Sequence, residues 1–335
     1  MTPSGTAAIP PLNEVLAAAV VVSLPMRVRF RGITAREVVL LEGPAGWGEF
    51  GPFPEYDDVE SAEWLRSALE SAWLDDPAPL RAHVPVNATV PAVDPEQVPG
   101  ILARFPGART AKVKVAERGQ DLEQDLARVR AVRELVPHVR VDANGGWSVD
   151  DAVTALTELV AQVPLEYAEQ PCATVPELVE LRLRLERSIP GGIRIAADES
   201  IRRADDPMRV VRAGGADVAI VKVAPLGGIR RVLALADELA DCGVPIVVSS
   251  ALDSAVGMGA GLAAAAALPD LPFACGLGTG GFFTADVATP RAMSNGTLPV
   301  GRVAPSRSGL DAVRVDAERE RWWLDRVRRC HALLE

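Results

Sequence analysis

The chain has 335 residues, 48% of them hydrophobic, and its 35 basic and 45 acidic residues give a formal net charge of −10. This length suffices for one large core plus a smaller domain, and the acidic balance argues against a nucleic-acid-binding surface. The N-terminal residues contain no basic segment followed by an apolar core, so we expect no signal peptide. Four cysteines without paired spacing (Cys172, Cys242, Cys275 and Cys330) indicate reduced thiols and a cytoplasmic location.

Residues 1–83 are predicted to form a small α+β domain. Strands are expected at residues 17–30 and 35–43, joined by a loop between Pro25 and Thr34 that would close over a binding site. A segment rich in Gly, Pro and aromatic residues, GWGEFGPFPEYDD, follows. Residues 61–73 then place apolar side chains at a helical spacing.

A spacing of about 27 residues extends from residue 84 to about residue 305, and within it five charged residues each stand at the end of an apolar run. Lys114, Asp142, Glu169, Asp198 and Lys222 are separated by 28, 27, 29 and 24 residues. This period fits one strand–helix unit, and eight such units form a (β/α)8 TIM barrel, either regular or in the modified (β/α)7β form. The apolar stretch 243–269 is broken at SSALDS, so it fits a buried strand, a loop and a buried helix better than a membrane span.

The regular spacing ends near residue 305. Residues 306–335 include ERERWWLDRVRR, which predicts a terminal helix that packs back onto the first domain. Trp322 and Trp323 are expected to be packing residues rather than ligand contacts.

Taken singly, several of these charged positions have a purely structural interpretation. Alternation places Lys112 and Lys114 on one face of a strand, which would also suit a solvated edge strand. Asp142 precedes Ala-Asn-Gly, a sequence that favours turns. Lys222 has no such surface interpretation, because both faces of a parallel barrel strand are covered. Surface residues would not fall in register at the ends of five successive units, so together they predict an active site.

Three of these residues are candidate metal ligands. Asp142, Glu169 and Asp198 would supply carboxylate oxygens from three successive strands. Such a set suits Mg²⁺, for which Mn²⁺ can substitute. No Cys or His falls at a matching position, which argues against zinc.

These motifs carry a family resemblance that extends over nearly the whole chain. KVK, VDAN, EQP, ADES and a lysine on the sixth strand resemble the muconate-lactonizing-type branch of the enolase superfamily. Within it, VDANGGWS, GWGEFGPFPEY, SSALDSAVG and GLGTGGFF are most similar to the o-succinylbenzoate synthase family of menaquinone biosynthesis in its actinobacterial form. The resemblance implies a capping domain over 1–83, a catalytic barrel over 84–305 and a C-terminal segment, 306–335, that returns to the cap.

The resemblance also implies a reaction. It is a Mg²⁺-dependent syn dehydration of 2-succinyl-6-hydroxy-2,4-cyclohexadiene-1-carboxylate to 2-succinylbenzoate. Lys114 would remove the proton α to the carboxylate and return it to the departing hydroxyl, with a pKa lowered by its surroundings. Lys222 would stay cationic and stabilise the enediolate, and Lys112 would bridge the substrate carboxylate.

Further residues are expected around this centre. Ser249, Ser250, Gly276, Gly278 and Thr279 are candidates to bind the substrate's carboxylates. Arg140 is a candidate for the same task or for orienting the ligands, and Asn144 and Glu199 are expected to orient ligands and lysines.

The alternative enzyme is an N-acylamino-acid racemase, or a bifunctional enzyme, because two lysines on opposite sides of one site also permit racemisation. GLGTGG stands where dipeptide epimerases carry Asp-x-Asp, which argues against an epimerase. A non-catalytic barrel should have lost at least one of these charged residues. We expect a monomer that binds a small carboxylate substrate and neither nucleic acid nor membrane.

Overall fold

The capping domain is a two-layer α+β unit. The computed structural model describes residues 9–30, 32–203 and 206–334. The cap contains α1 (Leu12–Ala17), β1 (Ala19–Phe30), β2 (Ile33–Gly43), β3 (Gly46–Phe50) and α2 (Asp58–Trp73). Its strands form an antiparallel sheet in the order β1-β2-β3, with Val21 opposite Val39. Helix α2 lies so close to the sheet that a side chain at Gly48 would collide with the backbone of Ala68.

Most of the segment predicted as a loop between Pro25 and Thr34 is strand, so that prediction was wrong. β1 continues to Phe30, β2 begins at Ile33, and the register between them shifts after Pro25. Such an irregularity lets a strand accommodate a proline, which has no N–H to donate. The hairpin also rests on the barrel, since the Pro25 carbonyl accepts the Thr284 N–H at 2.8 Å. Arg31 lies outside the described residues.

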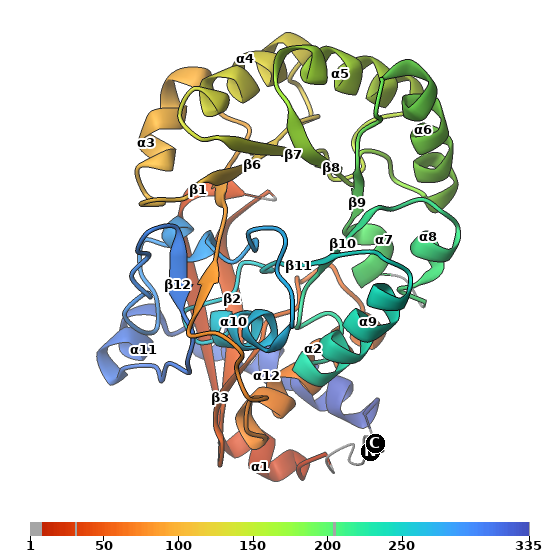
Figure 1. Cartoon of the computed structure of the whole chain (residues 1–335). Helices are drawn as coiled ribbons and strands as arrows, with labels where there is room; N and C mark the ends of the chain where they lie inside the picture. Colours follow the sequence, from red (N-terminus) through yellow and green to blue (C-terminus); the bar gives the residue numbers. More distant parts are fainter. Residues whose placement is uncertain (1–8, 31, 204–205, 335) are drawn as a thin grey trace.

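The barrel is built on a seven-stranded parallel sheet in the order β11-β10-β9-β8-β7-β6-β5. Its helices cover the outside of the sheet, as α4, α5 and α6 do over β6, β7 and β8 in Figure 1. The strands are β5 (Ala88–Val90), β6 (Thr110–Lys114), β7 (His138–Asp142), β8 (Leu165–Glu169), β9 (Ile195–Ala197), β10 (Val218–Val221) and β11 (Ile246–Val248). The helices are α3 (Val98–Leu102), α4 (Leu122–Arg133), α5 (Val149–Gln162), α6 (Val175–Ser188), α7 (Glu199–Arg202), α8 (Arg209–Arg212), α9 (Ile229–Asp241) and α10 (Met258–Ala267).

An irregular eighth segment completes the barrel. Cys275 forms a parallel bridge with Val86, just before β5, and Gly276 forms one with Ser249, just after β11. In place of an outer helix, the short 3₁₀ helix Thr279–Phe282 follows, and then β12 (Thr297–Pro299), which pairs with β4 (His83–Pro85). The expected barrel is therefore confirmed in its modified form, with a helical connection after each of seven strands.

Local sequence sets where several helices begin. Asp121 and Thr174 each accept the backbone N–H three residues on, from Gln124 and Glu177, and those two side chains accept the N-cap N–H in return. Capping of this kind satisfies amides that have no partner in the first helical turn. Helices α4 and α6 start at these points and so return the chain to the next strand.

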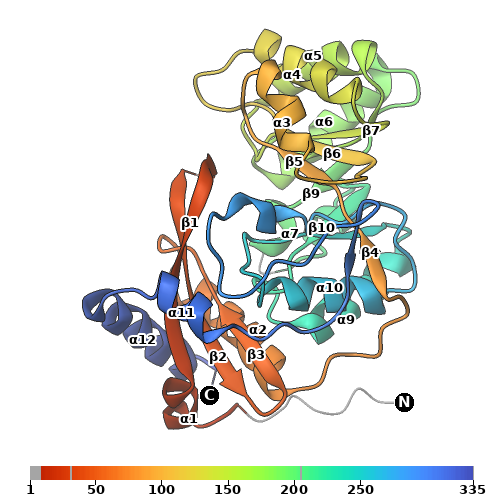
Figure 2. The same cartoon turned by 90° about the vertical axis from the view of Figure 1, so that its left-hand side faces the viewer.

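The C-terminal segment lies on the capping domain, as Figure 2 shows. It comprises α11 (Arg307–Val313) and α12 (Ala317–Ala332). Trp323 is fully buried and meets the Phe50 ring edge-on at 6.0 Å. Trp322 is 36% exposed and lies under the Arg319 guanidinium at 4.0 Å. Both tryptophans are thus packing residues.

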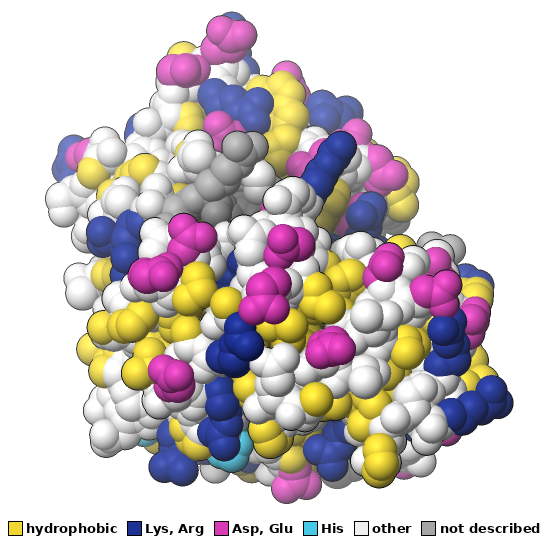
Figure 3. All heavy atoms as spheres, turned by 90° about the horizontal axis from the view of Figure 1, so that it is seen from above, with side chains coloured by type: hydrophobic (Ala, Val, Ile, Leu, Met, Phe, Trp, Pro, Cys, Tyr) yellow, Lys and Arg dark blue, Asp and Glu magenta, His cyan; other side chains and the backbone are white. Residues whose placement is uncertain are grey.

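The face in Figure 3 carries acidic and basic side chains interspersed among apolar ones. No helix in the described part of the chain combines the length and apolar character that crossing a bilayer requires.

Candidate active site

A cavity opens where the parallel strands end. It encloses about 440 Å³ with its open mouth included, a volume typical of small-ligand sites. Residues from or just after β5, β6, β7, β9, β10 and β11 line it, together with the eighth segment: Thr89, Lys112, Lys114, Asp142, Asn144, Asp198, Lys222, Ser249, Ser250, Ala251, Leu252, Gly276 and Thr279. The regular spacing of the sequence has therefore placed most of the predicted residues around one space, although Glu169 is not among those that line it.

The strands end here in strained turns. Ala116, Asn144, Gln170 and Leu252 have positive φ angles of 58°, 47°, 38° and 65°, a region that side chains other than glycine seldom adopt. These residues follow β6, β7, β8 and β11. Such strain persists only where surrounding contacts impose it, and it gathers at functional sites.

The lysine pair of β6 contacts two of the predicted ligands. The Lys112 Nζ lies 2.6 Å from Glu169 Oε1 and 2.9 Å from Asp142 Oδ2. The Lys114 Nζ lies 2.6 Å from the same Asp142 oxygen and 2.5 Å from Asn144 Oδ1. The period of two along β6 therefore directs both lysines inward rather than to solvent.

Burial and neighbouring charge act against each other on the carboxylates. Burial would raise the pKa of Asp142, but Lys112 and Lys114 outweigh it and lower that pKa well below its usual range. The same balance, with Lys222 and Arg202 as the cations, lowers the pKa of Asp198 to about 2. Glu169 differs: burial, reinforced by the charge of Asp142, raises its pKa to about 7.

The donor set suits a hard divalent cation. Within the described parts of the chain, no three acidic, His or Cys side chains are gathered as they would be around an ion; the three carboxylates instead hold lysines. Glu169 Oε2 is nevertheless buried without a hydrogen-bond partner. Three carboxylates on adjacent strands, one with an unsatisfied buried oxygen, fit Mg²⁺ or a similar ion.

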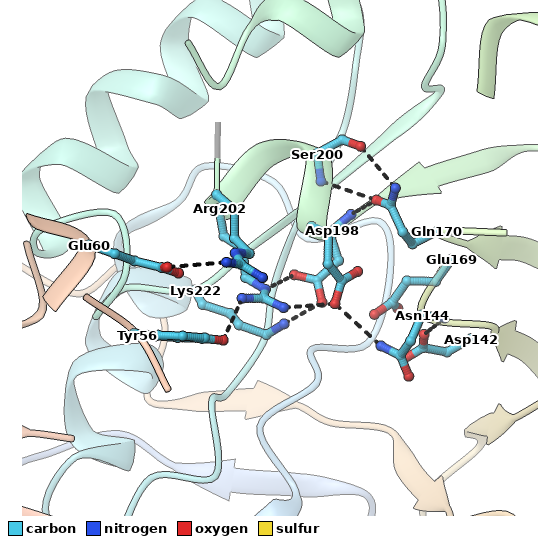
Figure 4. Close-up of polar contacts among 12 residues, drawn as sticks. Tyr56, Glu60, Asp142, Asn144, Glu169, Gln170, Asp198, Ser200, Arg202 and Lys222 are labelled. Atoms are coloured by element: carbon cyan, nitrogen blue, oxygen red, sulfur yellow. Dashed lines mark hydrogen bonds and ion pairs between the residues drawn. The ribbon is translucent and has the colours of Figure 1, made fainter. Parts of the chain in front are cut away.

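On the far side of the cavity, Lys222 and Arg202 hold Asp198 (Figure 4). The Lys222 Nζ lies 2.5 Å from Asp198 Oδ2, and the Arg202 Nε lies 3.2 Å from Asp198 Oδ1. The Arg202 Nη1 donates to the Tyr56 hydroxyl at 3.1 Å, and its Nη2 lies 2.7 Å from Glu199 Oε1. A cap side chain thereby reaches a predicted metal ligand through one arginine. The sequence reasoning missed Arg202, although its i,i+4 spacing from Asp198 could have indicated it.

Two amides orient the carboxylates. Asn144 donates its backbone N–H to Asp142 Oδ1 at 3.1 Å and its side-chain amide to Glu199 Oε1 at 3.5 Å. Gln170 Oε1 accepts the backbone N–H groups of Asp198 and Ser200 at 3.0 and 3.2 Å. Asn144 and Glu199 thus lie where a ligand-orienting role needs them, and Gln170 joins them.

The candidate substrate contacts separate into two groups. Ser249, Ser250, Gly276 and Thr279 line the cavity, with Ser250 Oγ 2.5 Å from Thr279 Oγ1. Gly278 instead lines an adjacent hollow beside α10. Thr89 and Leu252 line the cavity although the sequence reasoning did not single them out.

Arg140 does not lie against the cavity. It is fully buried, and its guanidinium donates to Glu166 Oε2, the Tyr167 hydroxyl and the Ala274 carbonyl at 2.6, 2.7 and 2.9 Å. Its position on β7, two residues before Asp142, places it one layer deeper in the barrel. The prediction of a substrate contact is therefore corrected, and Arg140 supports the barrel interior from below.

Comparisons with known proteins agree on one family. Residues 102–318 match the family described as enolase C-terminal domain-like, and residues 21–72 match the enolase N-terminal domain-like family. An o-succinylbenzoate synthase of Mycolicibacterium smegmatis is 61% identical over 98% of this chain and 100% of its own length. One from Mycobacterium bovis is 60% identical over 97% of each chain.

Solved structures share the fold at lower identity. The N-succinyl Arg/Lys racemase from Bacillus cereus has a TM-score of 0.71 at 18% identity and covers 89% of this chain and 97% of its own. The muconate lactonizing enzyme from Pseudomonas fluorescens, complexed with muconolactone, has a TM-score of 0.70 at 22% identity, covering 91% and 97%.

Proposed function

This chain belongs to the o-succinylbenzoate synthase family within the enolase superfamily, and we propose that it dehydrates 2-succinyl-6-hydroxy-2,4-cyclohexadiene-1-carboxylate to 2-succinylbenzoate. It is an enzyme of the hydro-lyase class, with its place in menaquinone biosynthesis. The observation that carries the proposal is that Lys114 and Lys222 approach one cavity from β6 and β10, with the carboxylates of Asp142 and Asp198 between them.

The reaction needs a base and a cation on different sides of the substrate. Strand order separates β6 from β10 by three strands, so the two lysines lie on different sides of the barrel mouth. Lys114 takes the proton α to the carboxylate. The electron pair left behind forms the ring double bond, and the carbon–oxygen bond to the hydroxyl breaks. Lys114 then gives its proton to the leaving oxygen on the same face, so water departs and the ring becomes aromatic.

The remaining charged groups hold the negative charge that develops on the substrate carboxylate. Lys222 is an ammonium paired with Asp198, and it can turn toward that charge. Lys112 already bridges Asp142 and Glu169; these two carboxylates raise its pKa against the effect of burial, so it stays cationic. The Ser250 and Thr279 hydroxyls offer donors to a second carboxylate.

Members of the enolase superfamily are typically metal-dependent. We propose Mg²⁺ here, held by Asp142, Glu169 and Asp198. Such an ion would supply positive charge to the substrate carboxylate while the proton is removed from the carbon α to it. The unsatisfied Glu169 Oε2 supports this assignment.

The test is an ultraviolet assay of the purified protein with the cyclohexadiene substrate, because the product gains an aromatic ring. We expect turnover that EDTA abolishes and that Mg²⁺ or Mn²⁺ restores. Full activity after rigorous chelation, with no metal found by elemental analysis, would exclude the metal assignment. An inactive metal-loaded protein would exclude the dehydration.

A second candidate activity is racemisation of an N-acylamino acid. The placement of one lysine on each side of the cavity favours it, because racemisation needs a proton carrier on both faces. Incubation of N-succinylamino acids in D₂O distinguishes the two activities. Incorporation of deuterium with loss of optical activity would establish a racemase beside the dehydratase.

The cellular compartment, oligomeric state and binding partners of the enzyme are proposals as well. We propose a cytoplasmic monomer that binds a small dicarboxylate, without nucleic acid or membrane. All four cysteines are free thiols, which supports a reducing compartment.

A further inference from the structure

One wall of the cavity is a loop that other parts of the chain help to hold in shape. Residues 249–257 connect β11 to α10, and Ser249, Ser250, Ala251 and Leu252 line the cavity. Backbone N–H groups of this loop donate to side chains. The Leu252 N–H donates to Ser250, the Ser254 N–H to Glu49, and the Ala255 N–H to Asp286. The N–H groups of Val256 and Gly257 both donate to the Ser254 hydroxyl. Ser250 and Ser254 belong to the 249–257 loop itself, whereas Glu49 and Asp286 hold it from other parts of the chain.

Leu252 is the strained point of this loop. Its φ of 65° is unusual for a leucine, and its side chain is 2% exposed. The Arg36 Nε donates to its carbonyl at 3.2 Å. An unfavourable backbone conformation of this kind persists only when contacts around it enforce it, and Arg36, a residue of cap strand β2, is one of those contacts.

Arg36 is itself fixed in place. It is 1% exposed, its Nη2 donates to the Gly51 carbonyl, and its guanidinium lies over the Phe53 ring at 4.3 Å. A buried guanidinium with these partners has little freedom to move. Its position is therefore fixed relative to the cap, and through its hydrogen bond it fixes the position of the Leu252 carbonyl.

Glu49, at the end of cap strand β3, holds the loop two residues later. It is buried, it accepts the Ser254 N–H at 3.1 Å, and it accepts the Ser254 hydroxyl as well. The loop comes so close that a Cβ on Gly257 would lie 2.6 Å from the Glu49 carboxyl carbon. Glycine is required at 257 by this approach rather than by its backbone angle, which is −60° in φ.

We propose that Arg36 and Glu49 are positioning residues, through which the capping domain fixes the 249–257 loop and so the shape of the substrate cavity. Neither residue is among those that line the cavity with Lys114, so both act through Leu252 and Ser254. The inference rests on the proposed function for its activity readout, whereas its structural readout does not depend on that function.

Another glutamate of the cap provides a matched control. Glu70 on α2 accepts the backbone N–H of Arg230, on barrel helix α9, at 3.1 Å, and the Arg230 guanidinium at 3.1 Å. Glu49 and Glu70 thus make the same kind of cap-to-barrel contact, but only Glu49 reaches the 249–257 loop.

The experiment compares Glu49→Ala, Arg36→Met and Glu70→Ala by steady-state kinetics and by amide hydrogen exchange. We expect Glu49→Ala and Arg36→Met to lower kcat/KM by about 10- to 100-fold, mainly through KM, because misplacing a substrate contact by about 1 Å can cost this much. Exchange should rise over residues 250–257 but not in β7 or β8. Glu70→Ala should change neither, and Glu49→Gln, which keeps an acceptor, should restore most of the activity.

A second pair of variants covers the case in which Glu49→Ala does not fold. Gly257→Ala displaces the Glu49 carboxyl without removing it, whereas Gly100→Ala has no atom within 4 Å of the new methyl group. Only Gly257→Ala should raise KM and loop exchange. Equal KM and equal loop exchange in Glu49→Ala and Glu70→Ala would overturn the proposal. If the wild-type protein does not dehydrate the substrate, the exchange data still decide whether the cap holds the loop.

Discussion

The barrel mouth and the interface between the cap and the C-terminal helix both bury charged side chains, but they satisfy them differently. At the mouth, charges face charges: Lys112 lies between Asp142 and Glu169. At the interface, Arg326 donates to the carbonyls of Phe53 and Tyr56 at 3.0 and 2.5 Å. The charges at the mouth can be re-paired by a charged substrate, whereas Arg326 is held by uncharged carbonyl oxygens.

Because of this difference, substitutions at the mouth and at the interface should affect catalysis and stability differently. Buried ion pairs add little to folding, because desolvation offsets their attraction. Removing one partner of a buried pair normally leaves an unpaired charge, but without Lys114 the Asp142 carboxylate still pairs with Lys112, so loss of Lys114 should harm the reaction more than the fold. Removing Arg326 should harm the fold, because the Phe53 and Tyr56 carbonyls would each lose a buried donor.

The largest effect is expected from Lys114→Ala. We expect kcat to fall by about 10⁴-fold or more, which corresponds to roughly 5.5 kcal/mol of barrier, because the variant lacks the group that moves both protons. Its melting temperature should stay close to that of the wild type. Isotope exchange of a bound substrate analogue in D₂O checks the assignment: exchange that persists in Lys114→Ala and depends on Lys222 would replace the one-base mechanism with a two-base one.

Substitutions of Lys222 test whether the reaction needs a positive charge or a base at this position of the mouth. Lys222→Ala should be severely impaired, whereas Lys222→Arg should retain more activity, since arginine keeps the positive charge beside Asp198 but cannot act as a base at neutral pH. Steady-state kcat of the two variants is the measurement. If Lys222→Arg is no better than Lys222→Ala, then charge alone is not what Lys222 contributes.

Arg326→Met tests the interface between the cap and the C-terminal helix. Loss of the donors to Phe53, Tyr56 and Ser61 should lower the unfolding free energy by about 2 kcal/mol, with kcat of the remaining folded enzyme little changed. Arg328→Met on the same helix is the control, because Arg328 is exposed and pairs with the neighbouring Asp325. Equal melting temperatures for the two variants would contradict a structural role for Arg326.

The last prediction concerns the pH dependence of the unfolding free energy. Burial, reinforced by the charge of Asp253, raises the pKa of Glu49 from 4.5 to about 8. The folded protein therefore holds this proton more tightly than the unfolded chain. Stability from this source is complete below pH 4.5 and is lost as pH rises toward 8. Glu49→Gln should remove this contribution, so its unfolding free energy should fall less between pH 5 and 8 than that of the wild type. Calorimetry across this range measures the difference, and parallel curves for the two proteins would refute the shift.

The modified barrel and the composition of its mouth were predictable because both follow from short-range order. A parallel strand, its helix and the return take about 27 residues, so residues at equal positions in successive units meet at one edge. Alternation along β6 then settled that Lys112 and Lys114 share a face. The expectation of a loop from Pro25 to Thr34 was wrong because both strands continue into this segment, where a register shift accommodates the proline.

What the sequence determined by itself is the set of charged residues at the strand ends and their order around the barrel. Only the tertiary structure decided that Arg140 lies below the cavity, that Arg202 connects Tyr56 to Asp198, and that Arg36 and Glu49 reach a loop more than two hundred residues away. The physical reason is that a periodic pattern encodes contacts between successive units. Contacts between the cap and the barrel depend instead on how two separately folded surfaces meet, and no local spacing records that.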